Sequence, residues 1–233
     1  MVSLMGFDGI WLDLEHHPRS LETAAQLMRA ARVGTSDIIA RPAKGEFMRM
    51  GRLLEAGANG IMYPRCDDAQ EAAEVVRWAK FAPLGQRGFD GSHPDVPFAS
   101  KSAPDYLAQA NEQTLIAIQI ESPSALEQAE PIAAVQGVDV LMLGPADFGI
   151  ASGIPGQWDH PRIDDAIRQM ASAAQRAGKH WGSPCRSPEH ARELMGLGAR
   201  FICYNSDFQI VKEGFDAIRK SFQSLGFAFQ HRL

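Results

Sequence analysis

Short apolar runs alternate with longer amphipathic segments along the chain. An apolar run of about four to eight residues between turn residues is typical of a buried strand. We expect seven strands, within residues 9–16, 37–43, 60–66, 115–122, 139–149, 180–185 and 201–207. In the first of them, alternation sets Trp11, Asp13 and Glu15 on one face. The apolar runs at 115–122 and 139–149 indicate strands that are fully buried and parallel, whereas the run at 180–185 predicts a weak strand.

Helices are predicted between these strands, because apolar residues recur there at helical spacing. Ser20 is a candidate N-cap, and Asp68 with Glu71 forms a capping box. The expected helices cover residues 21–33, 47–56, 68–80, 106–111, 124–134, 163–177, 187 to 196 or 198, and 208–225. Strict alternation of strand and helix means a parallel sheet, and polar residues that follow the strands favour a barrel with its site at their carboxyl ends. We therefore predict an α/β fold, with residues 1–233 as a single (β/α) barrel domain.

Composition narrows the class of protein. The formal charge is −5 and no basic run is present, which argues against a nucleic acid partner. No apolar run approaches the roughly 18 residues of a membrane span. The three cysteines lie far apart without zinc-type spacing, which indicates reduced thiols. With no signal-peptide pattern at the amino terminus, we expect a cytoplasmic protein without a membrane partner.

Two carboxylates follow two successive strands. Glu121 ends the run LIAIQIES, and Asp147 follows the run DVLMLGP. Neighbouring strands lie about 4.8 Å apart, so both carboxylates can bind one divalent cation. Hard oxygen ligands without cysteine or paired histidine favour Mg²⁺ or Mn²⁺. The alternative is that Glu121 caps the helix that begins at Ser122 and that Asp147 caps a turn.

The other strand ends carry acid, base and cationic groups: Asp13, Glu15, His16 and His17 after the first strand, Arg41 after the second and Arg65 after the third. A 2-oxo acid can chelate a divalent cation, which stabilises the enolate that forms when a C3 proton leaves. Arg41 would place a fixed positive charge beside the developing oxyanion. A histidine held by a carboxylate is the natural base near neutral pH.

Five motifs, DLEHHP, ARPA, PLGQRG, IQIES and GPADFG, together resemble the HpcH/HpaI aldolase family, the metal-dependent class II pyruvate aldolases. The resemblance covers nearly the whole chain. It implies a TIM-type (β/α)₈ barrel and a divalent metal, Mg²⁺ or Mn²⁺ first and Co²⁺ or Zn²⁺ as alternatives. The implied reaction is reversible cleavage of a 4-hydroxy-2-oxo acid to an aldehyde and pyruvate, or a close 2-oxo acid.

The resemblance also implies roles for individual residues. Glu121 and Asp147 would bind the metal, and the backbone amides of Ala146 and Asp147 would hold the pyruvate carboxylate. Gln119 is similar to a residue that lines the pyruvate site. The remaining roles fall on His16 as the base, Asp13 as its orienting partner and Arg41 as the oxyanion ligand.

Several alternatives stay open. His17 is either a second candidate base or a solvated loop residue. Arg65 either pairs with Asp67 or Asp68, or binds an acidic substrate tail. At the level of function, the alternatives to an aldolase are a citrate-synthase-like or other enolate-condensing carbon–carbon ligase, and a non-catalytic truncated binding protein.

Assembly and barrel closure form the last expectation. The loop at 83–105 and the tail at 226–233, with Phe227 and Phe229, would expose more apolar surface than a monomer leaves open. We expect a homo-oligomer, and the resemblance implies dimers that exchange the last helix and build hexamers.

Members of the family begin with a further strand, whereas residues 1–5 alone precede the first run here. We therefore predict a seven-stranded barrel, partly open or re-closed, with residues 1–5 as a remnant of the first helix; the alternative is a missed strand within 89–99.

Overall fold

The computed structural model describes residues 1–229, and its strands form one seven-stranded sheet. The strands are β1 (Gly9–Asp13), β2 (Asp37–Arg41), β3 (Gly60–Tyr63), β4 (Leu115–Ile120), β5 (Val140–Leu143), β6 (His180–Cys185) and β7 (Phe201–Tyr204). They lie in chain order, and every neighbouring pair is parallel. The predicted parallel sheet is confirmed, while the assignment of the whole chain to one domain stays a prediction.

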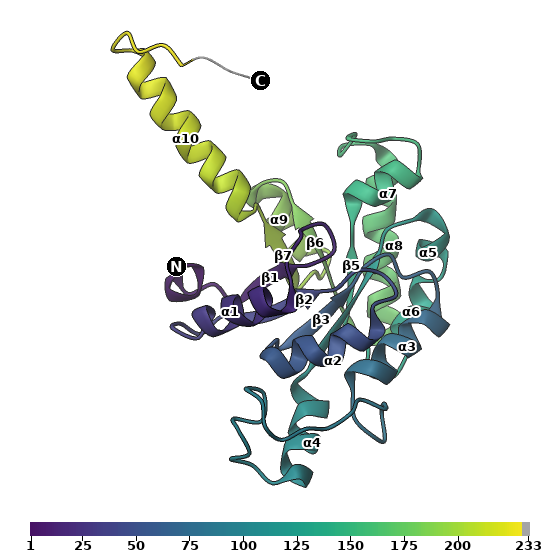
Figure 1. Ribbon diagram of the computed structural model, residues 1–233. Helices are drawn as coiled ribbons and strands as arrows, with labels where there is room; N and C mark the ends of the chain where they lie inside the picture. Colours follow the sequence, from purple (N-terminus) through teal and green to yellow (C-terminus); the bar gives the residue numbers. More distant parts are fainter. Residues whose placement is uncertain (230–233) are drawn as a thin grey trace.

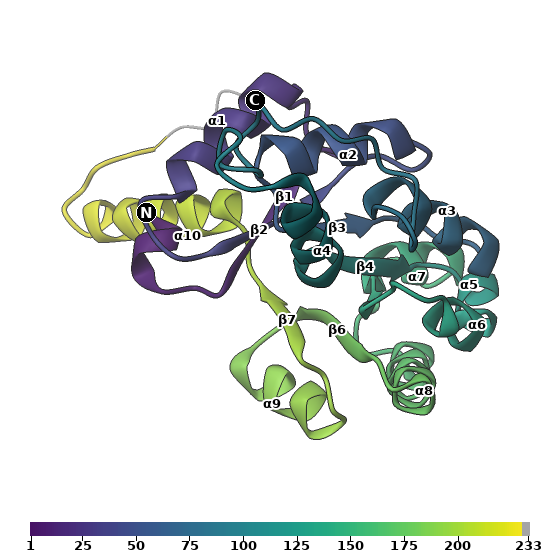
Figure 2. The same ribbon diagram turned by 90° about the horizontal axis from the view of Figure 1, so that it is seen from below.

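Helices lie between the strands and at both ends of the described chain, and most of the connecting helices cover the outer face of the curved sheet (Figures 1 and 2). They are η1 (Val2–Met5, a 3₁₀ turn), α1 (Leu21–Ala31), α2 (Phe47–Ala56), α3 (Ala69–Ala79), α4 (Ala103–Gln113), α5 (Pro123–Glu127), α6 (Ala129–Ala134), α7 (Pro145–Ala151), α8 (Pro161–Ala177), α9 (Pro188–Gly196) and α10 (Asp207–Gln223). Six begin at a side-chain cap that accepts the backbone N–H three residues on: Ser20, Asp68, Ser102, Ser122, Ser187 and Ser206. These caps satisfy amides that have no partner inside the helix.

Three elements differ from the sequence expectation. The helix expected at 124–134 is split at Gln128 into α5 and α6, because Pro131 has no N–H for the preceding turn and fits only near a helix start. The fifth strand ends at Leu143, and the following turn forms the short helix α7. Helix α4 begins earlier than expected, because Ser102 caps it.

The sheet separates two apolar layers. Its outer face packs with the helices in one large core, whereas its concave face carries a smaller cluster around Ile39, Met62, Ala117 and Met142. Side chains alternate along a strand, so Arg41 lies on the same face as Ile39 and Gln119 on the same face as Ala117. The concave face therefore becomes polar at the carboxyl ends of its strands.

The sheet is open at both edges. No pairing between β1 and β7 occurs within residues 1–229, and the strands form a half-barrel. The expected seven-stranded, partly open barrel is confirmed, and residues 89–99 form turns and bends, not an extra strand. Turn η1 contacts β1, so the expected first-helix remnant is a single 3₁₀ turn in this structure.

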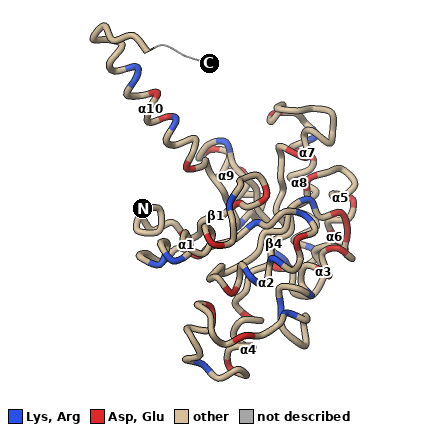
Figure 3. Tube along the Cα trace, viewed as in Figure 1, with Lys and Arg blue, Asp and Glu red and all other residues tan. Residues whose placement is uncertain are grey.

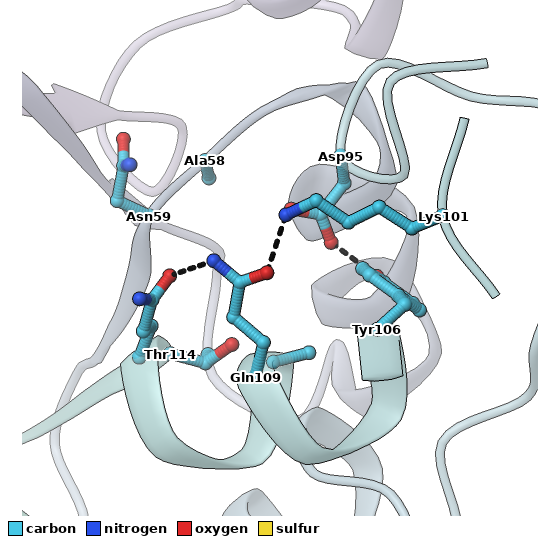
Figure 4. A pocket seen from close by; sticks show the side chains of 9 residues that line it. Ala58, Asn59, Asp95, Lys101, Tyr106, Gln109 and Thr114 are labelled. Carbon is cyan, nitrogen blue, oxygen red and sulfur yellow. Dashed lines mark hydrogen bonds between the residues drawn. The ribbon is translucent and has the colours of Figure 1, made fainter. Parts of the chain in front are cut away.

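The long loop between α3 and α4 folds against α4. Phe81, Val96 and Tyr106 form a small apolar cluster there. Beside it lies a small polar pocket of about 90 Å³ at the amino-terminal end of the sheet, where Tyr106 donates to Asp95 and Lys101 donates to Gln109 (Figure 4). Residues that directly precede β3 and β4 line this pocket. It therefore lies at the opposite end of the strands from Glu121, which follows β4.

Helix α10 projects away from the sheet (Figure 1) and buries none of its residues. Its exposed apolar side chains are Phe208, Ile210, Val211, Phe215, Ile218 and Phe222. The predicted apolar tail continues this surface with Phe227 and Phe229, while its residues 230–233 lie outside the described part of the chain. Acidic and basic residues are interspersed over the fold (Figure 3), and no helix in the described range is long and apolar enough to cross a bilayer.

Candidate active site

The carboxyl ends of β1, β2 and β4 bring together Asp13, Arg41 and Gln119. Arg41 Nε lies 2.8 Å from Asp13 Oδ1, and Arg41 Nη1 donates to Gln119 Oε1 at 3.3 Å. The guanidinium stacks over the Trp11 ring at 4.6 Å from its centroid. Arg41 is only 8% exposed, so these contacts hold its guanidinium, and with it the positive charge, in one orientation.

Glu121 is buried beside this network. Its Oε2 accepts the Arg65 backbone N–H at 2.9 Å, and its Oε1 accepts Gln119 Nε2 at 3.2 Å. Burial raises the pKa of Glu121 to about 7, and the negative charge of Asp147 adds to the rise, although the Arg65 amide opposes it. Glu121 thus sits in a place where its own charge is poorly compensated.

Neither carboxylate caps a helix. Ser122 Oγ accepts the Ala125 N–H and caps α5, which rules out that role for Glu121. Asp147 lies in the first turn of α7, whose N-cap residue is Gly144. The capping alternative for these two carboxylates is therefore wrong for a helix start.

The donor set fits a hard divalent cation. Glu121 and Asp147 offer carboxylate oxygens, and their mutual repulsion is the kind that a bound cation relieves. Within residues 1–229, no group of three or more His, Cys, Asp or Glu side chains could hold a metal. A cation held by two carboxylates would leave its other coordination positions to substrate oxygens and water.

The histidines pair differently from the sequence prediction. Asp13 Oδ2 lies 3.7 Å from His17 Nε2, whereas His16 Nε2 lies 3.5 Å from Glu15 Oε2. The expected His16–Asp13 pair is wrong because the chain turns after β1: the Glu15 N–H donates to Asp13 Oδ1, and residue 17 folds back over residue 13. Both rings are about half exposed, and the identity of the base stays a prediction.

Of the two alternatives that the sequence left open for Arg65, the ion pair with Asp67 or Asp68 does not form. Arg65 Nε lies 2.9 Å from Glu15 Oε1, while Asp67 pairs with Lys44 and Asp68 caps α3. Its backbone adopts a left-handed φ of 47°, and its side chain lies by the strand ends. The Arg65 side chain is half exposed and accessible to a substrate.

Glu15 has a role that the sequence reasoning missed. Its side chain is 3% exposed and lies between Arg65 and Arg41, whose Nη1 is 3.2 Å from Glu15 Oε2. The alternation in β1 had placed Glu15 on the same face as Asp13, and that was the available signal. Its long-range partners follow from the tertiary fold.

The family model for HpcH/HpaI aldolase/citrate lyase matches residues 1–213. The chain is 31% identical to a 5-keto-4-deoxy-D-glucarate aldolase of Klebsiella pneumoniae, over 96% of this chain and 86% of that protein. It is also 31% identical to a hydroxypyruvate/pyruvate aldolase of Delftia acidovorans, over 91% and 79%. The crystal structure of an HpcH/HpaI aldolase from Desulfitobacterium hafniense superposes with a TM-score of 0.89 at 28% identity, covering 94% of this chain and 85% of that one.

Gly144 tests the placement of Glu121. A Cβ at position 144 would overlap Glu121 Oε1 and lie 2.6 Å from its Cδ, so Gly144→Ala must displace the carboxylate. We expect loss of metal-dependent activity with the circular dichroism spectrum retained. Gly51→Ala, in α2, is the control, because a Cβ there meets nothing within 4 Å. Activity of Gly144→Ala within twofold of the parent would contradict this placement.

Stability of the metal-free protein should depend on pH through Glu121. The folded-state pKa of about 7 exceeds the ordinary 4.5, so the folded state retains the proton, and stability falls as pH rises from 4.5 to 7. Glu121→Gln removes this loss, which is on the order of 3 kcal/mol at full titration. In the presence of a chelator, the difference between the melting temperature of Glu121→Gln and that of the parent protein should increase from pH 5 to pH 8. The exposed Glu112→Gln is the control, and a Glu121→Gln difference that is flat with pH would refute the prediction.

Proposed function

The chain belongs to the HpcH/HpaI aldolase/citrate lyase family, a family of carbon–carbon lyases, and on that premise we propose a divalent-metal-dependent 2-oxo acid aldolase. Its substrate is a 4-hydroxy-2-oxo acid, which it cleaves reversibly to an aldehyde and pyruvate or a close 2-oxo acid. The observation that carries the proposal is the buried Glu121, which Gln119 joins to the fixed charge of Arg41 and whose pKa is raised by burial and by the charge of Asp147.

Glu121 and Asp147 would hold the cation, Mg²⁺ or Mn²⁺ first and Co²⁺ or Zn²⁺ as alternatives, and the cation supplies Lewis acidity for enolate formation. The amides of Ala146 and Asp147 would bind the substrate carboxylate. Pro145 has no N–H and the Phe148 N–H bonds to Gly144, so these two amides are the free donors of the first turn of α7.

Arg41 would stabilise the negative charge on the former keto oxygen. Asp13, Glu15 and Gln119 hold its guanidinium before substrate arrives, so little reorganisation is needed during the reaction. Gln119 would in turn line the 2-oxo acid site, since it contacts both Arg41 and Glu121.

Either histidine next to a carboxylate could move the C3 proton, and we propose His16 on the family motif. Arg65 is proposed to bind an anionic group at the far end of the substrate, because half of its side chain is open to solvent. The Klebsiella relative acts on a sugar acid, which is in keeping with such a contact.

A pyruvate exchange assay tests the proposal without knowledge of the aldehyde. We expect the methyl protons of pyruvate to exchange into D₂O with added Mg²⁺ or Mn²⁺, and exchange to stop after exhaustive EDTA treatment, as followed by proton NMR. If exchange occurs with none of Mg²⁺, Mn²⁺, Co²⁺ and Zn²⁺, the aldolase is rejected and the non-catalytic alternative is favoured. The enolate-condensing ligase shares this exchange and is distinguished by its products, since it would not consume pyruvate with an aldehyde.

Arg41→Lys should reduce the exchange rate by at least about tenfold, because an ammonium cannot reproduce the fork that contacts Asp13, Glu15 and Gln119. The control is Arg49→Lys, whose ion pair lies within α2 and its preceding residue. A variant that keeps its rate within about threefold, under 1 kcal/mol of transition-state stabilisation, would remove Arg41 from the proposed role.

We further propose a homo-oligomer, with α10 packed on a neighbouring copy. An apolar helix surface with no buried residue is the supporting observation. Phe215→Asp should lower the molar mass in light scattering, whereas Lys212→Ala on the same helix should not. A monomeric parent protein at micromolar concentration would reject this. A cytoplasmic location stays a prediction.

A further inference from the structure

The loop that follows β3 touches the site through two different groups of one residue. The Arg65 N–H donates to Glu121 Oε2, and the Arg65 guanidinium lies 2.9 Å from Glu15. Arg65 makes both contacts while its backbone adopts a left-handed φ of 47°. A non-glycine residue rarely adopts this conformation, and it persists only where the surroundings enforce it.

The Lys44 side chain contacts this turn directly. It comes from the loop after β2, and its Nζ donates to the Arg65 carbonyl at 2.6 Å. The same Nζ lies 2.6 Å from Asp67 Oδ2 and 3.2 Å from Glu71 Oε2. One ammonium thus holds the turn at Arg65 and at Asp67, and joins it to Glu71 of α3.

The acidic partners of Lys44 are themselves fixed. Glu71 Oε2 accepts the Asp67 N–H at 2.8 Å, and Glu71 Oε1 accepts the Tyr63 hydroxyl at 2.7 Å. Tyr63 is fully buried, and its hydroxyl accepts the Gly45 N–H, next to Lys44 in the chain. These interactions of Lys44, Tyr63, Asp67 and Glu71 join the loops after β2 and β3, and we call this network the bracket. It does not contact the reacting atoms.

We propose that Lys44 is a positioning residue for the candidate metal site, which it serves by fixing the Arg65 amide on Glu121 and the Arg65 guanidinium on Glu15. The link to metal binding rests on the function proposed above, whereas the link to the turn does not. Without the ammonium, Asp67 and Glu71 would face each other uncompensated, and their repulsion would open the turn. Glu121 would then lose a donor, and Glu15 would lose one of its two arginines.

Hydrogen exchange measures the turn directly. In metal-free Lys44→Met, we expect amide exchange in a peptide covering residues 63–68 to accelerate by about tenfold or more, equivalent to about 1.4 kcal/mol of local stability. Lys44→Arg keeps the charge and should restore slow exchange. The control is Arg176→Met, which removes an ion pair with Glu130 on the outer helices at 2.9 Å and should leave this peptide unchanged.

Mn²⁺ titration measures the consequence for the site. We expect Lys44→Met to weaken Mn²⁺ binding by about fivefold or more, with Lys44→Arg and Arg176→Met within about twofold of the parent. Asp67→Asn, at a side chain that is 68% exposed, is the milder second variant and should accelerate exchange in the same peptide.

The two measurements separate the two proposals. A parent protein that binds no Mn²⁺ rejects the proposed metal site, and the positioning role toward it, while exchange still reports whether Lys44 holds the turn. Unchanged exchange at residues 63–68 in both Lys44→Met and Asp67→Asn overturns the bracket. Accelerated exchange with unchanged Mn²⁺ affinity overturns the positioning role.

Discussion

The buried charge of Glu121 is the constraint on which the site depends. Burial raises the pKa of this carboxylate to about 7, and the negative charge of Asp147 adds to the rise. The Arg65 amide and the Gln119 amide compensate it only in part. Gly144 has no side chain because Glu121 occupies the space that a Cβ would fill. A divalent cation is the partner that would satisfy both carboxylates together.

The rest of the site keeps the cationic groups in place around this carboxylate. Arg41 is held by Asp13 and Glu15 above Trp11, and Glu15 also binds Arg65. The two arginines are therefore oriented by buried or partly buried acids before any substrate binds. In the proposed aldolase, this preorganisation would let Arg41 act on the developing oxyanion without rearrangement.

Features set by local pattern could be predicted from the sequence. The seven strands follow from their apolar runs, and the convergence of Asp13, Arg41 and Glu121 follows from the common direction of parallel strands. Partners distant in sequence could not be predicted in this way. The pairing of Arg65 with Glu15 depends on a left-handed residue and a bracket from another loop, and the exchange of His16 for His17 beside Asp13 depends on the turn after β1.

The most direct test of the account is the stoichiometry of Mn²⁺ binding, measured by isothermal titration calorimetry at pH 8. We expect one site per chain in the parent protein. This site should be lost in both Glu121→Gln and Asp147→Asn, while both variants retain the circular dichroism spectrum of the folded protein. If both carboxylates bind the same cation, loss of either one must weaken Mn²⁺ binding. Absence of Mn²⁺ binding by the parent, or affinity within twofold of the parent in either variant, would contradict the central claim that these two carboxylates form one metal site.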